Sequence, residues 1–164
     1  MTNTASHVLP APLAVRNLLE DLLGREVTVR PGDPMQSADL AGVLAALYTD
    51  DTLRLSAVIG MDLPLAAYCA AALGLMPAGG AQDSIQEKVL SPILAENASE
   101  LCNVLTGLLN REGAAHLKLY QLYQPGQQVP ADAGAHLLAL GNRLDLTVEV
   151  SRYGSGRFAL SIVD

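Results

Sequence analysis

The chain has 164 residues, the usual size of a single domain, and its seventeen acidic and ten basic side chains give a formal net charge of −7. This negative surplus disfavours functions that depend on attraction to phosphate backbones or anionic lipid, so we expect neither a nucleic-acid nor a membrane partner. Half of the residues are hydrophobic but only 4% are aromatic. This predicts a core of Leu, Ala and Val, and it leaves almost nothing on which bases could stack. We expect one domain over residues 1–164, with residues 1–10 flexible.

The N-terminal segment and the uncharged stretch 63–82 indicate a cytoplasmic chain. The first residues contain no basic side chain followed by a long apolar run, as a secretory signal would. Residues 63–82 are interrupted by prolines and glycines and are rich in Ala, so a buried helix followed by a flexible loop explains them better than a membrane span. Cys69 and Cys102 lie in apolar stretches without CxxC spacing. We expect two buried free thiols there, rather than a disulfide or a metal site.

In chain order, residues 11–23 predict a helix that ends at the following glycine, and residues 26–30 predict a short strand. The apolar runs 41–49 and 53–59 are separated by a short polar turn and predict a β-hairpin, although the alanines of the first run would suit a helix equally well. Residues 62–73 predict a helix, because an N-capping Asp is followed by a Pro just inside the helix.

The middle of the chain predicts a linker and a long helical stretch. Residues 76–81 contain glycines typical of a linker, and Asp83-Ser84 can cap a helix that reaches to about residue 110. Pro92 interrupts this stretch, so the helix is either kinked there or begins near Pro92 after a shorter one.

The last third of the chain predicts a strand over 117–123 and a short helix over 131–141. Residues 144–150 and 157–162 alternate apolar and polar side chains and predict a terminal hairpin that turns at 152–156. Because helices and hairpins are interspersed rather than strictly alternating, the fold class expected is α+β.

Four polar or small residues fall on one narrow stripe of the helix that contains residues 94–109. At about 100° per residue, Glu96, Glu100, Asn103 and Gly107 lie within a narrow sector of the helical wheel. The opposite side is apolar: Leu94, Ala98, Leu101, Leu105, Leu108 and Leu109. On geometry alone, the solvated face of an ordinary amphipathic helix is the better explanation of such a stripe, and nothing in the spacing makes it catalytic.

The order of these residues resembles a known motif. Glu100-x-x-Asn103, preceded by Glu96 and followed by Gly107, resembles the signature helix of the CheC/CheX/FliY family of chemotaxis response-regulator phosphatases. In that family a proline follows on a later strand, and Pro125 occupies nearly the same spacing. A single motif resembles the CheX type most. The resemblance implies an α+β fold with an antiparallel sheet layer packed against two long helices, and a homodimer.

The resemblance also implies a function, namely hydrolysis of the aspartyl phosphate of a CheY-type response regulator. The family brings no nucleophile and no cofactor of its own, and the Mg²⁺ belongs to the partner regulator. Asn103 is expected to orient the water and Glu100 to pair with the regulator's active-site Lys. Glu96 and Ser99 are expected to contact the partner, and Gly107 to permit its close approach.

Two other functions stay open. The chain can be a CheX-like module that binds a receiver domain or a flagellar-switch partner without hydrolysis. It can also be a dimeric structural module whose acidic stripe only faces solvent.

Other suggestive residues receive structural interpretations. The histidines His7, His116 and His136 are too scattered for a metal triad, and no metal site is expected. Asp50-Asp51 is most simply the hairpin turn rather than a cation site.

The glycine pairs and the two tyrosines of the strand predicted over 117–123 also have structural interpretations. Gly79-Gly80 and the glycines of 154–156 lack the Lys of a phosphate loop and the spacing of a dinucleotide loop, and they predict ordinary loops. Tyr120 and Tyr123 are expected to pack through their rings as sheet residues.

Overall fold

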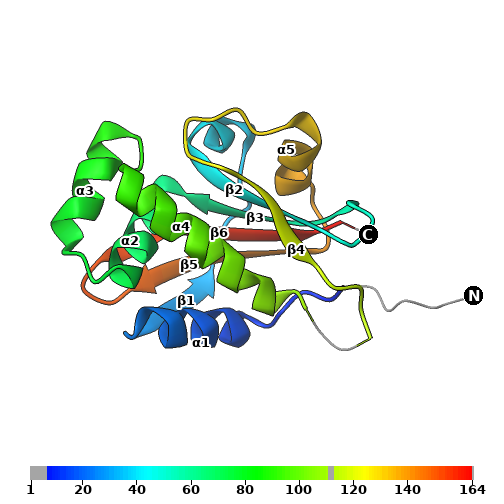
Figure 1. The fold of residues 1–164 in the computed structure, drawn as a ribbon, viewed down its shortest axis with the longest axis horizontal. Coiled ribbons are helices and arrows are strands. Elements are labelled where there is room, and N and C mark those ends of the chain that lie inside the picture. Colours follow the sequence, from blue (N-terminus) through cyan, green and yellow to red (C-terminus); the bar gives the residue numbers. More distant parts are fainter. Residues whose placement is uncertain (1–6, 111–112, 164) are drawn as a thin grey trace, which may run out of the picture.

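The computed structural model describes residues 7–110 and 113–163 (Figure 1). It contains one six-stranded antiparallel sheet in the order β1-β5-β6-β3-β2-β4. The strands are β1 (Val27–Pro31), β2 (Val43–Thr49), β3 (Leu55–Asp62), β4 (Lys118–Tyr123), β5 (Arg143–Val150) and β6 (Gly154–Ile162). The helices are α1 (Pro12–Leu23), α2 (Leu63–Leu73), α3 (Ala78–Glu87), α4 (Pro92–Val104) and α5 (Ala131–Leu138), with two 3₁₀ turns, η1 (Ser37–Gly42) and η2 (Leu105–Leu108).

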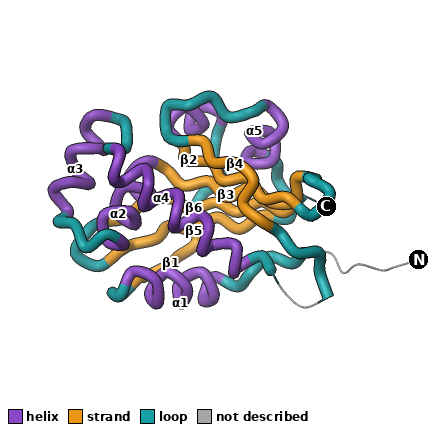
Figure 2. The backbone as a smooth tube through the Cα atoms, viewed as in Figure 1, coloured by secondary structure: helices purple, strands orange, loops and turns teal. Residues whose placement is uncertain are grey.

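The main core lies between one face of the sheet and the helices α1, α2 and α4, to which α3 adds Ala81. Helix α4 crosses in front of the strands in Figure 2. A smaller core lies on the other face, under α5 and the segment that contains η1. The smaller core consists of Met35, Val43, Ala45, Leu47, Val58, Ala133, Leu137 and Ala159. The expected α+β fold with an antiparallel sheet layer packed against helices is confirmed.

Strand β2 is buried along its whole length because both of its faces are covered. Leu44, Ala46 and Tyr48 point into the main core, whereas Val43, Ala45 and Leu47 belong to the smaller one. This explains the continuous apolar run in the sequence and settles its assignment as a strand. The predicted hairpin with β3 is confirmed.

Local sequence features end the first elements as expected. Helix α1 ends at Gly24, whose φ of 67° is the left-handed conformation that glycine adopts readily. In the β2–β3 turn, Asp50 Oδ1 accepts hydrogen bonds from the backbone N–H groups of Thr52 and Arg54 at 2.8 and 3.0 Å. The expectation that Asp50-Asp51 forms the turn is confirmed.

Helix α2 is the central helix of the main layer, and almost all of its residues are buried. Asp62 Oδ1 caps it by accepting a hydrogen bond from the Leu65 N–H at 3.0 Å. The uncharged stretch is thus a buried helix, as expected, and Cys69 on it and Cys102 on α4 are both buried and free. None of the helices among the described residues is long and apolar enough to span a membrane.

The expected linker over 76–81 and the cap at Asp83-Ser84 are wrong. Residues 78–81 form the first turns of α3, so Gly79-Gly80 is helical and not a loop. The chain leaves α3 at Lys88, which has a φ of 61°, and α4 begins anew after Ser91, whose Oγ accepts from the Leu94 N–H at 3.4 Å. The second alternative at Pro92 is therefore confirmed. Ser84 is buried, and its hydroxyl accepts a hydrogen bond from the Ser91 N–H at 3.1 Å, which joins the two helices.

The expected loop at 154–156 is also wrong, because β6 begins at Gly154. A Cβ at Gly156 would lie 2.5 Å from Asp62 Oδ1 and 2.6 Å from the Leu65 nitrogen. The glycine is therefore required where the N-terminus of α2 crosses the strand, rather than for a turn.

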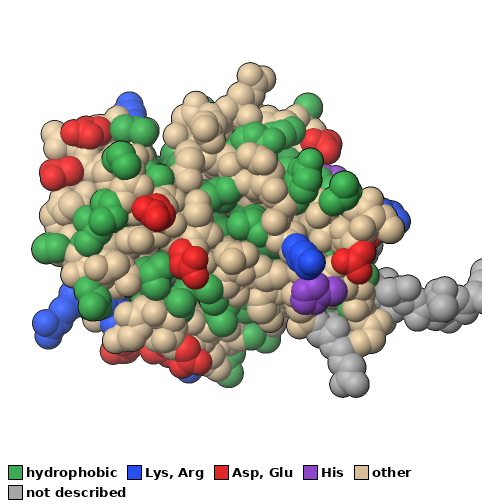
Figure 3. Space-filling model, in the orientation of Figure 1, with side chains coloured by type: hydrophobic (Ala, Val, Ile, Leu, Met, Phe, Trp, Pro, Cys, Tyr) green, Lys and Arg blue, Asp and Glu red, His purple; other side chains and the backbone are tan. Residues whose placement is uncertain are grey.

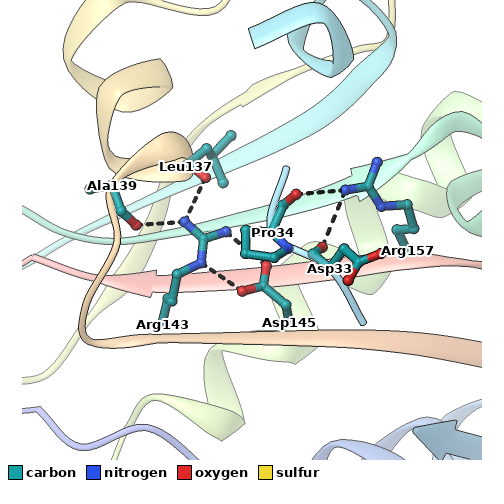
Figure 4. A network of polar contacts seen from close by, with 7 residues as sticks. All are labelled: Asp33, Pro34, Leu137, Ala139, Arg143, Asp145 and Arg157. Carbon is teal, nitrogen blue, oxygen red and sulfur yellow. Dashed lines mark hydrogen bonds and ion pairs between the residues drawn. The ribbon is translucent and has the colours of Figure 1, made fainter. Parts of the chain in front are cut away.

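A polar network ties α5 to the sheet (Figure 4). Arg143 makes a two-pronged ion pair with Asp145 at 2.6 and 2.7 Å and donates to the carbonyls of Leu137 and Ala139. The side chains of Arg143 and Asp145 are only 8% and 9% exposed. Arg157 of the neighbouring strand holds the segment before η1 through the carbonyl of Pro34.

The histidines occupy separate environments. His7 is buried with Nε2 2.8 Å from the Ala115 carbonyl oxygen, His116 is exposed and His136 is half-buried on α5. Of the segment expected to be flexible, residues 1–6 lie outside the described residues.

Candidate functional site

The structure brings the predicted site residues to one face of α4 and η2. Glu96, Glu100 and Asn103 are exposed on α4, Ser99 beside them is half-buried, and Gly107 is exposed in η2. The back of the helix is buried in the main core through Leu94, Ala98, Leu101, Cys102 and Leu105. The amphipathic division expected from the sequence is therefore present.

Asn97 fixes the rotation of α4 on α2. Its Nδ2 donates to the Ala70 carbonyl oxygen at 3.1 Å. A Cβ at Gly74, which follows α2, would lie 2.5 Å from the same nitrogen, so the missing side chain makes room for this bond. With Asn97 held inward, its neighbour Glu96 and the rest of the stripe face solvent.

Tyr48 supports the end of α4 that carries Asn103. Its hydroxyl donates to the Cys102 carbonyl oxygen at 2.6 Å, inside the core. Cys102 lies in the last turn of α4, where helix carbonyls commonly need donors from outside the helix, and Tyr48 of β2 supplies one. Burial, with the nearby Cys102 thiol, raises the pKa of Tyr48 well above its usual value.

The two cysteines near this site are not activated as nucleophiles. Burial raises the pKa of Cys69 and of Cys102 to about 12, so both thiols stay protonated at neutral pH and neither is an activated nucleophile. Among the described residues, no group of three His, Cys, Asp or Glu side chains is placed to hold a metal ion. The chemistry of this face therefore rests on carboxylates and a carboxamide.

The turn after Asn103 presents an open backbone. Thr106 Oγ1 donates to the Asn103 carbonyl oxygen at 2.5 Å and stabilises the change from α-helix to 3₁₀ turn. A Cβ added at Gly107 would meet nothing within 4 Å. Packing among the described residues therefore does not require a glycine at this position.

The residues on either side of β4 bind the two ends of the segment that runs from α4 to Asn110. The Asn110 side chain exchanges two hydrogen bonds with the Leu117 backbone, at 2.7 and 3.0 Å, and Gln124 Nε2 donates to the Ala95 carbonyl oxygen at 3.4 Å. The resemblance placed Pro125 on a later strand, and this is wrong in detail: Pro125 is buried in the turn that follows β4, two residues after the strand ends. Its neighbour Gln124 makes the hydrogen bond to α4.

Sequence reasoning missed these supporting residues. Asn97 lies between the polar stripe and the apolar back of its helix, and this intermediate position is the one signal that could have identified it. Nothing in the sequence links Tyr48 or Gln124 to the helix, because their partners are distant backbone carbonyls.

The sequence matches no protein-family model and no curated protein. Its structure resembles FliM in a FliM–SpeE complex from H. pylori, with a TM-score of 0.62, 9% identity and coverage of 92% of this chain and 80% of that one. It resembles CheX in a CheX–CheY–BeF3–Mg complex from Borrelia burgdorferi, with a TM-score of 0.56, 15% identity and coverage of 92% and 94%. For FliY from Thermotoga maritima the TM-score is 0.52, the identity 16% and the coverage 94% and 84%.

The chain has the fold shared by CheX, FliY and the FliM middle domain. The resemblance found in the sequence is confirmed as a shared fold. In this CheX-type fold, the residues that match the family motif lie on the exposed side of α4, and Figure 3 shows isolated acidic side chains over that helix. Residues 89–110 contain no Lys or Arg, so the carboxylates of Glu96 and Glu100 have no basic neighbour on their own helix.

Proposed function

We propose that the protein dephosphorylates a CheY-type response regulator. The observation that supports this most is that Glu100 and Asn103 are exposed, one turn apart, on α4 of a CheX-type fold. The opposite side of that helix is packed in the main core. A surface of this kind suits a reaction whose electrophile and metal come with the partner.

Asn103 acts on the attacking water. Hydrolysis forms a bond from water oxygen to phosphorus and breaks the bond from phosphorus to the aspartyl oxygen, which leaves phosphate and a free carboxylate. Catalysis of this step is largely positioning. A carboxamide donates and accepts hydrogen bonds without ionising, so it can hold the water in line without adding charge beside the phosphoryl group.

The other stripe residues dock the regulator. Glu100 pairs with the regulator's active-site Lys and sets the register of binding. Glu96 and Ser99 contact the partner farther along the helix, and Gly107 lets its backbone come close. The partner supplies the Mg²⁺, and the protein itself uses no cofactor.

The test follows phosphate release from a phosphorylated CheY-type receiver. Asn103→Ala is expected to lower the rate at saturating protein by about a hundredfold or more, because misplaced reactants lose that much. Asn17→Ala is the matched control, since Asn17 is an exposed Asn on α1. Equal rates for the two variants would refute the role of Asn103. Glu100→Lys is expected to raise KM, because it puts like charges together.

A second candidate is a binding module without hydrolysis. Its support is that the FliM neighbours were crystallised with SpeE and with FliG, so this fold also serves in protein complexes. Saturable binding of a receiver or of a FliG-type partner, together with an unchanged rate of phosphate release, would favour this candidate.

A homodimer is part of the proposal, as in the CheX type. The two edge strands of the sheet are β1 and β4, and an unpaired strand edge is suited to pairing with a second chain. Sedimentation equilibrium of the purified protein tests this, and a single monomeric species up to about 100 µM would contradict it, since weaker association is negligible at cellular concentrations.

A further inference from the structure

Two of the eight large hydrophobic side chains that are exposed among the described residues lie on α4 and on the neighbouring strand β4. Ile93 is 54% exposed at the start of α4, and Tyr120 is 60% exposed on β4. Tyr120 was expected to pack through its ring, and this expectation is wrong. The register between β2 and β4 shifts here: Leu47 pairs with Gln121 and Tyr48 pairs with Leu119. Tyr120 is thus the extra residue of a β-bulge, and bulges redirect side chains at sheet edges.

Ile93 belongs to the same stripe as the proposed site. At 100° per residue, it lies about 60° from Glu96 and about 20° from Glu100 on the helical wheel, one turn before Glu96. From Ile93 to Gly107 the stripe runs for about 21 Å at 1.5 Å per residue. Each partner contributes roughly 800 Å² to an interface of standard size, which is a patch about 30 Å across, so a stripe of this length fits within one interface.

Tyr120 lies level with Asn103. Strand β4 runs back alongside α4, as Figure 1 shows, and the two are joined by the contacts from Asn110 to Leu117 and from Ala95 to Gln124. Between these contacts the strand covers about 23 Å, and the helical segment also covers about 23 Å. Because the lengths match, Tyr120 lies at about the same level along the axis of α4 as Asn103.

We infer that Ile93 and Tyr120 complete the docking surface for the receiver domain, as the apolar contacts on either side of Glu100 and Asn103. This inference rests on the proposed function. Exposed carboxylates with no basic residue on their helix select a partner that presents a cation, as the receiver does with its Lys. A polar centre alone gives specificity and little affinity, whereas Tyr and aliphatic anchors carry most of the binding energy of protein interfaces.

The experiment measures the Kd of the protein for a beryllofluoride-activated, Mg²⁺-loaded CheY-type receiver, together with kcat and KM for phosphate release. Ile93→Ala and Tyr120→Ala are each expected to weaken binding and raise KM about tenfold, with kcat at saturation within about twofold of the wild type. Tyr120→Phe keeps the ring and is expected to restore binding. Leu140→Ala is the matched control, because Leu140 is 83% exposed after α5, on the other face of the sheet.

Each outcome decides between the inference and the function on which it rests. Kd values equal to that of Leu140→Ala would overturn the docking role, and the phosphatase proposal would survive if Asn103→Ala still lost its rate. Weakened binding by both variants without any hydrolysis by the wild type would support the docking surface and reject the phosphatase. Dissociation of a homodimer by Tyr120→Ala, with receiver affinity unchanged, would assign this face to a second copy of the chain and overturn the inference.

Discussion

Tyr48→Phe tests how the core holds the end of α4 that carries Asn103. The substitution removes only the hydroxyl that donates to the Cys102 carbonyl at 2.6 Å, and Tyr48 is fully buried, so water cannot replace the lost donor. An unpaired buried carbonyl costs about 1–3 kcal/mol. The midpoint of that range, about 2 kcal/mol, corresponds to a fall in Tm of about 4–8 °C for a domain of this size.

The assay is urea unfolding followed by circular dichroism, with thermal unfolding as a second measure. Tyr120→Phe is the matched control, because it deletes a hydroxyl from an exposed ring of the same sheet and is expected to change the free energy of unfolding by less than about 0.5 kcal/mol. If Tyr48→Phe were as stable as Tyr120→Phe, with an unchanged m-value, the hydrogen bond would not support the helix end and the reasoning would fail.

Three further predictions concern the rest of the fold. Arg143→Ala leaves Asp145 buried without its partner and is expected to lower the free energy of unfolding by about 3–5 kcal/mol. Replacing both residues by Leu is expected to cost less than this single change, and urea unfolding of the two variants checks the order. Gly156→Ala places a methyl group against the N-terminus of α2 and is expected to lower the free energy of unfolding by about 1–3 kcal/mol. Gly79→Ala in α3 has open space around it and is expected to raise the free energy of unfolding by about 0.5–1 kcal/mol. A lower stability of Gly79→Ala would contradict the helical assignment of that turn. Burial raises the pKa of Asp62 despite the hydrogen bond from Leu65, so its charged form opposes folding above that pKa, and stability from this group increases as the pH falls through it. Asp62→Asn keeps a capping oxygen and is therefore expected to be more stable than the wild type at pH 7, with a difference that shrinks towards pH 4 in parallel unfolding curves; a difference that grew on acidification would be contrary to this sign.

Elements with strong local signals could be predicted from the sequence, and those defined by tertiary contacts could not. The glycine after α1, the Asp–Pro start of α2 and the hairpin turn at Asp50 act within a few residues, so their outcomes follow from local chemistry. The region 76–91 was mispredicted because Gly79-Gly80 has low helix propensity. Packing of α3 against α2 outweighs this propensity, and the hydrogen bond between Ser84 and Ser91 depends on how α3 and α4 meet.

The candidate site shows the same division. The stripe from Glu96 to Gly107 could be found from helical periodicity, because a helix that packs on a core must bury its apolar side. Its supports could not, since Asn97 and Tyr48 bind carbonyls far away in the sequence. Tyr120 was mispredicted because a bulge shifts the alternation of β4, and a bulge is a property of two paired strands rather than of one sequence.

The residues that hold α4 in place are different from the residues that α4 exposes on its outer face. Asn97 and Tyr48 hold α4 through its buried side, whereas the side chains of Glu100 and Asn103 are exposed and Gly107 has open space around it among the described residues. The exposed stripe can therefore change at little cost in stability, while the architecture persists at the 9–16% identity that links this chain to FliM, CheX and FliY. A shared fold at such identity consequently carries no activity by itself. Under the proposed function, the few side chains on the outer face of α4 decide whether this chain hydrolyses a phosphoryl group or only binds a partner, and substitutions should be directed there.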